Sequence, residues 1–267
     1  ILTYRNINIV RQMNTSKLNV SNIKIIKNSL IKKKIFKLNN DLINELKNVN
    51  VKSIPKPKSK EKFSNYIDRI YKNKKELISE IYNFLPSSLV INKFIFSDQI
   101  LKIVKNFGVK VPSLGSPPII RIDTPDNKYS TPWHVDAAFS RNEKKSITIW
   151  IPLSDLNKNS GFIELQKELV LLKNIKFKVN KKNKFPLKIK NLDEFKTKNI
   201  LQAKCNLGDI LIFDQRILHR SGINKSSKCR VSLQIRFNEL YRAKKLQSTF
   251  KAVFNKLTLK KNGKLIY

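Results

Sequence analysis

Five short segments in the second half of the chain constrain the fold more than any other feature. Each is rich in β-branched and aromatic residues, and turn residues separate it from the next, a pattern typical of β-strands. The sequence between them lacks amphipathic helical periodicity, which favours an antiparallel sandwich or barrel over a parallel α/β sheet. The predicted strands cover residues 118–122, 146–153, 161–165, 209–213 and 229–237.

The first half of the chain shows helical periodicity instead. Between residues 61 and 85 apolar residues recur every three or four positions, and Pro86 follows. We therefore expect one amphipathic helix that packs against the sheet and ends before the proline. Ser97 is a favourable N-cap for a second helix that ends near Asn106.

Two lysine-rich segments have weak periodicity. Residues 1–60 are predicted to be an N-terminal extension, partly helical or irregular, in which residues 41–47 fit a short helix. Residues 167–199 are expected to be a long excursion between core strands. Such an excursion is either a lid over a binding site or a tolerated surface insertion.

The chain is strongly basic. Its 267 residues include 55 Lys and Arg against 19 Asp and Glu, a net charge of +36. Such a surface attracts nucleic acid, acidic membranes or anionic small molecules. Because the lysines are spread through the whole sequence alongside Ile and Asn, we interpret the charge as a solvated background, not as a recognition patch.

Cysteine content and hydropathy indicate the compartment. Cys205 and Cys229 are the two cysteines, without the spacing of a zinc site, so they are expected to be free thiols in a reducing compartment. No apolar run approaches the roughly 20 residues that cross a bilayer, and the first residues lack a signal-peptide pattern. The sequence therefore predicts a soluble, cytoplasmic protein without a membrane partner.

The two histidines of the chain stand in a pattern that favours a metal site. His134 precedes Asp136 by two positions, and His219 follows a predicted strand. Two neutral imidazoles and one carboxylate can occupy one face of an octahedral iron(II) ion and leave three positions open. His-x-Asp alone is a weak pattern, and the distant histidine adds most of the weight.

The predicted strand after His219 has one cationic face. Because strand side chains alternate, Arg230, Ser232, Gln234 and Arg236 share a face, while apolar residues form the other. In a closed β structure the polar face would look into the lumen. A buried arginine without an anion would carry a large desolvation cost, so an inward Arg230 implies a carboxylate or similar partner.

These residues together resemble the phytanoyl-CoA dioxygenase-like branch of iron(II)- and 2-oxoglutarate-dependent oxygenases. The resemblance covers roughly residues 115–240 and rests on ligand order, on the Gly-Asp strand before the distal histidine, and on the arginine eleven residues after it. It is carried by WHVD, SITIWIPLSDLNKNSGFIEL and NLGDILIFDQRILHRSGINKSSKCR. The family implies a mainly β fold, a double-stranded β-helix or jelly-roll core with N-terminal helices. The predicted oxygenase domain spans residues 61–267, with helices at about 61–107, the core at about 108–240 and a C-terminal segment at 241–267.

The resemblance also implies site residues. His134, Asp136 and His219 would bind iron(II) and act in catalysis, and Arg230 would pair with the distal carboxylate of the cosubstrate 2-oxoglutarate. Ser221 would help hold that carboxylate, and Trp150 would line the cosubstrate pocket. Arg121 and Tyr129, just upstream of the metal motif, are candidates for cosubstrate or substrate contact.

The function implied is a dioxygenase that hydroxylates a small-molecule metabolite while 2-oxoglutarate and O2 become succinate and CO2. Abundant lysine would suit an anionic substrate such as a carboxylate, phosphonate or phosphorylated metabolite. Two alternatives stay open. The net charge would also fit a nucleic-acid-directed oxidative demethylase or a basic nucleic-acid-binding protein, although no basic face interleaved with aromatic residues is evident. The other alternative is a non-catalytic jelly-roll protein that binds metal.

Overall fold

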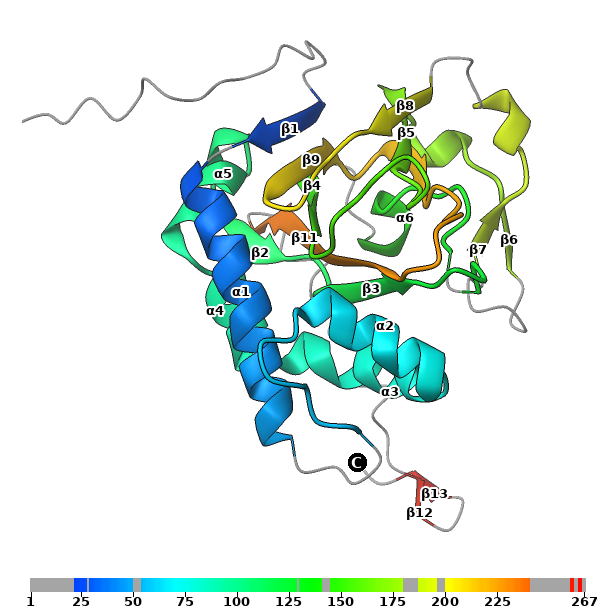
Figure 1. Cartoon of the computed structure of the whole chain (residues 1–267). Helices are drawn as coiled ribbons and strands as arrows, with labels where there is room; N and C mark the ends of the chain where they lie inside the picture. The colour runs from blue at the N-terminus through cyan, green and yellow to red at the C-terminus, as the bar shows by residue number, and fades with distance from the viewer. Residues whose placement is uncertain are drawn as a thin grey trace, which may run out of the picture.

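The core of the molecule consists of two antiparallel sheets that pack against each other, with helices on the outer side of the larger sheet (Figure 1). This computed structural model describes residues 22–27, 29–49, 54–128, 130–140, 145–179, 187–195, 200–240, 260–261 and 264–265. The predicted fold class, a jelly-roll core with N-terminal helices, is confirmed. Among the described helices, none combines the length and apolar character that crossing a membrane requires.

All five predicted strands are present, and antiparallel pairing arranges them in the two sheets. The larger sheet has the order β1-β9-β4-β11-β2, and β3 also pairs with β11. Its strands are β1 (Ile23–Lys27), β2 (Pro112–Leu114), β3 (Ile119–Asp123), β4 (Ser146–Pro152), β9 (Asp209–Asp214) and β11 (Arg230–Glu239). The smaller sheet has the order β10-β5-β8, formed by β5 (Ile163–Leu169), β8 (Ile200–Ala203) and β10 (Ile217–Arg220).

The two faces of β11 differ as the alternation predicts. Its apolar side chains lie in the hydrophobic core between the larger sheet and the helices. The opposite face looks toward the smaller sheet, where Trp150 of β4 packs with Leu165 of β5 and Ile217 of β10. This inner space between the sheets is called the lumen below. The outward residues of β11 are Val231, Leu233, Ile235 and Phe237.

The helical layer differs from prediction in one respect: residues 61–85 do not form one helix. The chain leaves helical geometry at Lys74, whose φ and ψ are −147° and 66°. Between Tyr71 and Leu77 the sequence has only polar residues, so the apolar stripe is interrupted and a continuous helix would have nothing to bury there. The second predicted helix is confirmed. The layer contains α2 (Phe63–Asn73), α3 (Leu77–Phe84), a 3-10 turn at Leu85–Ser87, α4 (Leu89–Ile95) and α5 (Asp98–Asn106).

The region before residue 60 contributes more structure than the short helix predicted for 41–47. A 20-residue helix, α1 (Ser29–Asn48), buries Ile35, Leu42 and Leu46 in the main core. The strand β1 pairs along its whole length with β9, at the edge of the larger sheet. The predicted domain boundaries themselves stay a prediction.

The excursion of residues 167–199 is partly ordered against the core. Beyond the end of β5 it forms a 3-10 turn (Leu172–Asn174), β6 (Phe177–Val179), β7 (Leu187–Ile189) and a second 3-10 turn (Leu192–Glu194). Val170 and Ile175 pack there with Trp133 and Val135, so the excursion covers the stretch that carries the His-x-Asp pair. In the C-terminal segment, β12 (Lys260–Lys261) pairs with β13 (Lys264–Leu265).

Candidate metal centre

A β-bridge between the two histidines positions the centre. The backbone N–H of His134 donates to the carbonyl of His219 at 2.9 Å, and the reverse hydrogen bond has the same length. The bridge joins the stretch before α6 (Ala137–Ser140) to β10, which is itself paired with β5. Two sequence segments more than 80 residues apart are thereby fixed side by side, with Asp136 directly before the helix.

The three side chains meet in the buried interior. One ligand atom from each of His134, Asp136 and His219 lies within 4.8 Å of the other two. The Nε2 atom of His134 is 3.5 Å from Oδ1 of Asp136, and Nε2 of His219 is 3.7 Å from Oδ2. The residues are 8%, 0% and 1% exposed, respectively. The sequence prediction that these three residues come together is thus met by the fold.

Backbone contacts aim both imidazoles at the same point. Nδ1 of His134 lies 2.8 Å from the carbonyl of Pro132, and Nδ1 of His219 lies 3.0 Å from that of Ile217. A carbonyl can only accept, so each Nδ1 carries the proton and each Nε2 presents a lone pair. Nε2 of His219 is fully buried and has no hydrogen-bond partner among the described residues. An orphaned nitrogen lone pair facing a carboxylate fits a metal ion.

Burial keeps His219 neutral. It lowers the pKa of this imidazole to about 3, and the neighbouring His134 acts in the same direction. A neutral imidazole is the form that binds a metal. The ring of Phe213 also packs edge-on against His219, with the ring centroids 4.8 Å apart, and limits its rotation.

Three donors from the larger sheet hold Asp136. Oδ2 accepts from Thr148 at 2.6 Å and from Gln234 at 3.1 Å, and Oδ1 accepts from Arg236 at 2.6 Å. A carboxylate oxygen has two in-plane lone pairs. Oδ2 is therefore saturated, while Oδ1 keeps one lone pair on the side of His134. This hydrogen-bonding pattern suits Asp136 to bind a metal through Oδ1 alone.

Charge also favours the ionised form of Asp136. Burial by itself would raise the pKa of this carboxyl, but the Arg236 guanidinium outweighs burial and holds the pKa well below its usual range. The centre therefore offers two imidazole nitrogens and one anionic oxygen. That donor set leaves three positions of an octahedral ion open to other ligands.

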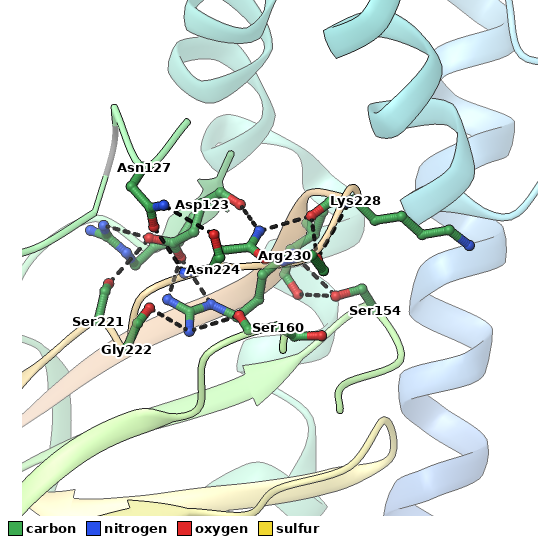
Figure 2. A network of polar contacts seen from close by, with 12 residues as sticks. Asp123, Asn127, Ser154, Ser160, Ser221, Gly222, Asn224, Lys228 and Arg230 are labelled. Carbon is green, nitrogen blue, oxygen red and sulfur yellow. Dashed lines mark hydrogen bonds and ion pairs between the residues drawn. The ribbon is translucent and has the colours of Figure 1, made fainter. Parts of the chain in front are cut away.

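A second polar cluster surrounds Arg230 (Figure 2). Its NH2 atom lies 3.0 Å from Oδ2 of Asp123, and Nε donates to the same oxygen at 3.3 Å. NH1 donates to the carbonyls of Ser160 and Gly222 at 3.5 and 3.4 Å. Arg230 is only 2% exposed. The anion expected for a buried Arg230 is therefore present in the protein itself, as Asp123 of the neighbouring strand.

Asp123 is shared among several groups. Its Oδ1 atom accepts from the hydroxyl of Ser221 at 3.1 Å and lies 3.6 Å from NH2 of Arg121. Burial would raise the pKa of Asp123, but Arg230 and Arg121 hold it below its ordinary value. Asn224 fixes the surrounding backbone because its amide donates to the carbonyls of Asp123 and Lys228 (Figure 2).

The structure places the remaining predicted residues as follows. Arg230, Ser221 and Arg121 gather around Asp123, and Trp150 lies in the lumen beside Leu211. Tyr129 lies outside the described residues. The cosubstrate roles of these residues stay predictions.

Four residues of the site had no predicted role. Asp123 stands two positions after Arg121 in a strand, so alternation could have placed both on one face. Gln234 and Arg236 were placed on the polar face of β11, but nothing in the sequence shows that they reach Asp136. Thr148 carries no signal beyond its place in a strand.

Comparison with solved structures supports the fold. The apo structure of EctD from S. alaskensis aligns with a TM-score of 0.53 at 12% sequence identity, covering 82% of this chain and 73% of EctD. The structure of EvdO2 from Micromonospora carbonacea var. aurantiaca, complexed with 2-oxoglutarate, aligns with a TM-score of 0.51 at 12% sequence identity. The alignment covers 84% of this chain and 91% of EvdO2. A search of curated proteins finds no match.

At these identities the solved structures support the fold, and the family follows from the sequence match. The family description phytanoyl-CoA dioxygenase (PhyH) matches residues 58–232. This range contains the whole His134–Asp136–His219 group and Arg230, and it exceeds half of the chain. The chain therefore belongs to the phytanoyl-CoA dioxygenase family of non-haem iron, 2-oxoglutarate-dependent enzymes.

Proposed function

We propose that this protein is an iron(II)- and 2-oxoglutarate-dependent dioxygenase that hydroxylates a small-molecule metabolite. One oxygen atom of O2 would enter the substrate and the other would enter succinate, with release of CO2 from 2-oxoglutarate. The observation that carries the proposal is the buried His134–Asp136–His219 group with its orphaned Nε2 atom. The family membership and the fold shared with a 2-oxoglutarate complex, that of EvdO2, support it.

The three ligands have separate tasks in this proposal. His134 and His219 would hold iron(II) through Nε2, each oriented by the carbonyl that accepts from its Nδ1–H. Asp136 would supply the negative charge through Oδ1. Iron(II) bound there would supply the chemistry that activates O2. The buried position of the ligands would exclude bulk water from the reacting groups.

Arg230 would hold the distal carboxylate of 2-oxoglutarate. Since Asp123 now accepts from Nε of Arg230 and forms an ion pair with its NH2 atom, the incoming carboxylate has to take over part of this pairing. Ser221 and Arg121 contact the other oxygen of Asp123 and would keep that side chain compensated after the exchange. The binding of 2-oxoglutarate is then an exchange of one carboxylate for another, with no arginine left unpaired.

Anaerobic spectroscopy tests the proposal. Mixing the protein with iron(II) and 2-oxoglutarate is expected to give a weak visible charge-transfer band. The band should disappear in His219→Ala and Asp136→Ala and persist in Asp193→Ala, which removes an exposed aspartate. A wild-type protein that folds but gives no band would refute the proposal.

Turnover separates the proposed function from the alternatives. Succinate release in air with pooled small metabolites is expected to exceed the uncoupled rate for one pool. A higher rate with methylated oligonucleotides would favour the nucleic-acid demethylase instead. Metal binding without any succinate would favour a non-catalytic jelly-roll protein.

A further inference from the structure

The side chain of Arg236 lies between the metal centre and the protein surface. It is on the inner face of β11, directly opposite Thr148 of β4. Its NH2 atom donates to Oδ1 of Asp136 at 2.6 Å, and NH1 donates to the hydroxyl of partly exposed Ser116 at 3.3 Å. The residue is 9% exposed, so its charge is nearly removed from water.

Within the described part of the chain, one donor of this guanidinium has no acceptor. The Nε atom of Arg236 is buried and lacks a hydrogen-bond partner among the described residues. Arg230, the other arginine of the inner face, differs because its Nε donates to Asp123. Leaving a buried N–H of a cation without an acceptor is costly, so native structures rarely keep one without a purpose.

The position of this donor points to the group that would accept from it. The guanidinium already contacts the one oxygen of Asp136 that has a lone pair left for a metal. A ligand bound at the open positions of that metal therefore comes close to the same guanidinium. Because the donor is cationic and nearly buried, an anionic oxygen is its best acceptor.

We propose that Arg236 is a positioning residue with two tasks. One nitrogen fixes Asp136 as a ligand through a single oxygen, and Nε–H donates to the metal-side carboxylate of the 2-oxo acid. This inference rests on the proposed function and extends it, since Arg230 would hold the distal end of the same molecule. Arg230 and Arg236, both on β11, then bind the two carboxylates at opposite ends of 2-oxoglutarate.

Two substitutions test these tasks. Arg236→Lys keeps the positive charge but offers a single nitrogen, and Arg236→Gln removes the charge and keeps a hydrogen-bond donor. We expect the dissociation constant of 2-oxoglutarate for the iron(II) protein, titrated anaerobically through the charge-transfer band, to rise at least about tenfold in both. The band maximum should also move, because it reports on the metal-side group. The absorption spectrum of the cobalt(II) protein without oxo acid should shift in Arg236→Gln as Asp136 reorients.

A matched control is Arg69→Lys. Arg69 also makes a charge-assisted contact to a carboxylate, 2.8 Å from Glu61, but in the helical layer. This variant should keep the wild-type dissociation constant and band. Thermal unfolding and circular dichroism of every variant show which of them fold.

The outcomes are distinct. A folded Arg236→Lys or Arg236→Gln protein with an unchanged dissociation constant and band position would overturn the inference. A shifted cobalt(II) spectrum with unchanged oxo-acid binding would overturn the donation by Nε–H. Loss of the band in the wild-type protein would instead refute the proposed function.

Discussion

Replacing Asp123 by asparagine removes the charge that compensates Arg230 and keeps the shape of the side chain. Asp123 is 1% exposed and contacts Arg230 at 3.0 Å, Arg121 at 3.6 Å and the Ser221 hydroxyl at 3.1 Å. Removing one partner of a buried ion pair typically costs about 3–5 kcal/mol of unfolding free energy. Because the amide oxygen can still accept from Arg230 or Ser221, we expect the lower end, about 3 kcal/mol.

The same change should strengthen the binding of 2-oxoglutarate. In the wild-type protein the distal carboxylate has to displace Asp123 from Arg230, whereas in Asp123→Asn it meets an arginine without a charged competitor. We expect at least a tenfold lower dissociation constant, which corresponds to about 1.4 kcal/mol. Saturating 2-oxoglutarate should therefore restore part of the lost stability.

Two measurements check this prediction. Denaturant unfolding of the metal-free protein gives the stability loss, and anaerobic titration of the iron(II) protein gives the dissociation constant. Asp126→Asn is the control: Asp126 is paired with Lys75 at the surface, and breaking such a pair costs at most about 1 kcal/mol. The reasoning is refuted if Asp123→Asn folds but binds 2-oxoglutarate no more tightly than wild type, because Asp123 then does not compete for Arg230.

Two further predictions concern stability. The hydroxyl of Tyr66 is buried and lacks a partner within the described part of the chain, and burial raises its pKa to about 12. The pKa of Tyr66 in the folded protein lies above its value of about 10 in the unfolded chain. The neutral hydroxyl therefore contributes its full stabilisation of the folded state below about pH 10, and this contribution is lost as the pH rises toward about 12. In denaturant unfolding, Tyr66→Phe should lose less stability at alkaline pH than the wild-type protein. At pH 7 its free energy of unfolding should be equal to that of the wild type or up to about 1 kcal/mol higher. A clear loss of stability at pH 7 would contradict this prediction. Gly161→Ala should cost at least about 2 kcal/mol, because φ is +73° and the new Cβ would lie 2.4 Å from the Ile223 carbonyl oxygen and 2.5 Å from that of Gly222. At Gly108 φ is +98° but an added Cβ would make only ordinary contacts, so Gly108→Ala should lower the free energy of unfolding by less. Equal losses in the two variants would show that backbone strain, and not the close contacts at Gly161, causes the loss.

The strands and their faces could be predicted because alternation is a local property. The polar and apolar faces of β11 follow directly from its sequence, and the structure confirms which face meets the helices. Desolvation cost correctly required an anion beside Arg230. The desolvation cost could not show whether the anion belongs to a bound ligand or to the protein itself. Asp123 lies opposite Arg230 only because of the register of β3 on β11, which joins residues 107 positions apart.

The N-terminal elements escaped prediction for a different reason. The buried residues of α1 recur every three or four positions (Ile31, Ile35, Leu38, Leu42 and Leu46), but the lysines and the exposed Phe36 between them obscure this stripe. In β1, Lys24 interrupts the apolar positions. The helix is stabilised by packing, with Ile35 and Leu42 fully buried in the main core. The strand is stabilised by pairing with β9, a contact with a segment nearly 190 residues later in the chain. Tertiary contacts of this kind decide the structure of weakly patterned segments.

The charges of the lumen connect the metal and the oxo acid. Both arginines of the inner face of β11 are matched to carboxylates from other segments, Arg230 to Asp123 and Arg236 to Asp136. These two pairs are neutral together. A divalent metal ion and dianionic 2-oxoglutarate also sum to zero, so binding both preserves the balance. Binding either alone changes the net charge of this buried site by two units, which is unfavourable. Each should therefore strengthen the binding of the other, and because such coupling is reciprocal, the site favours the metal and the 2-oxo acid as a pair.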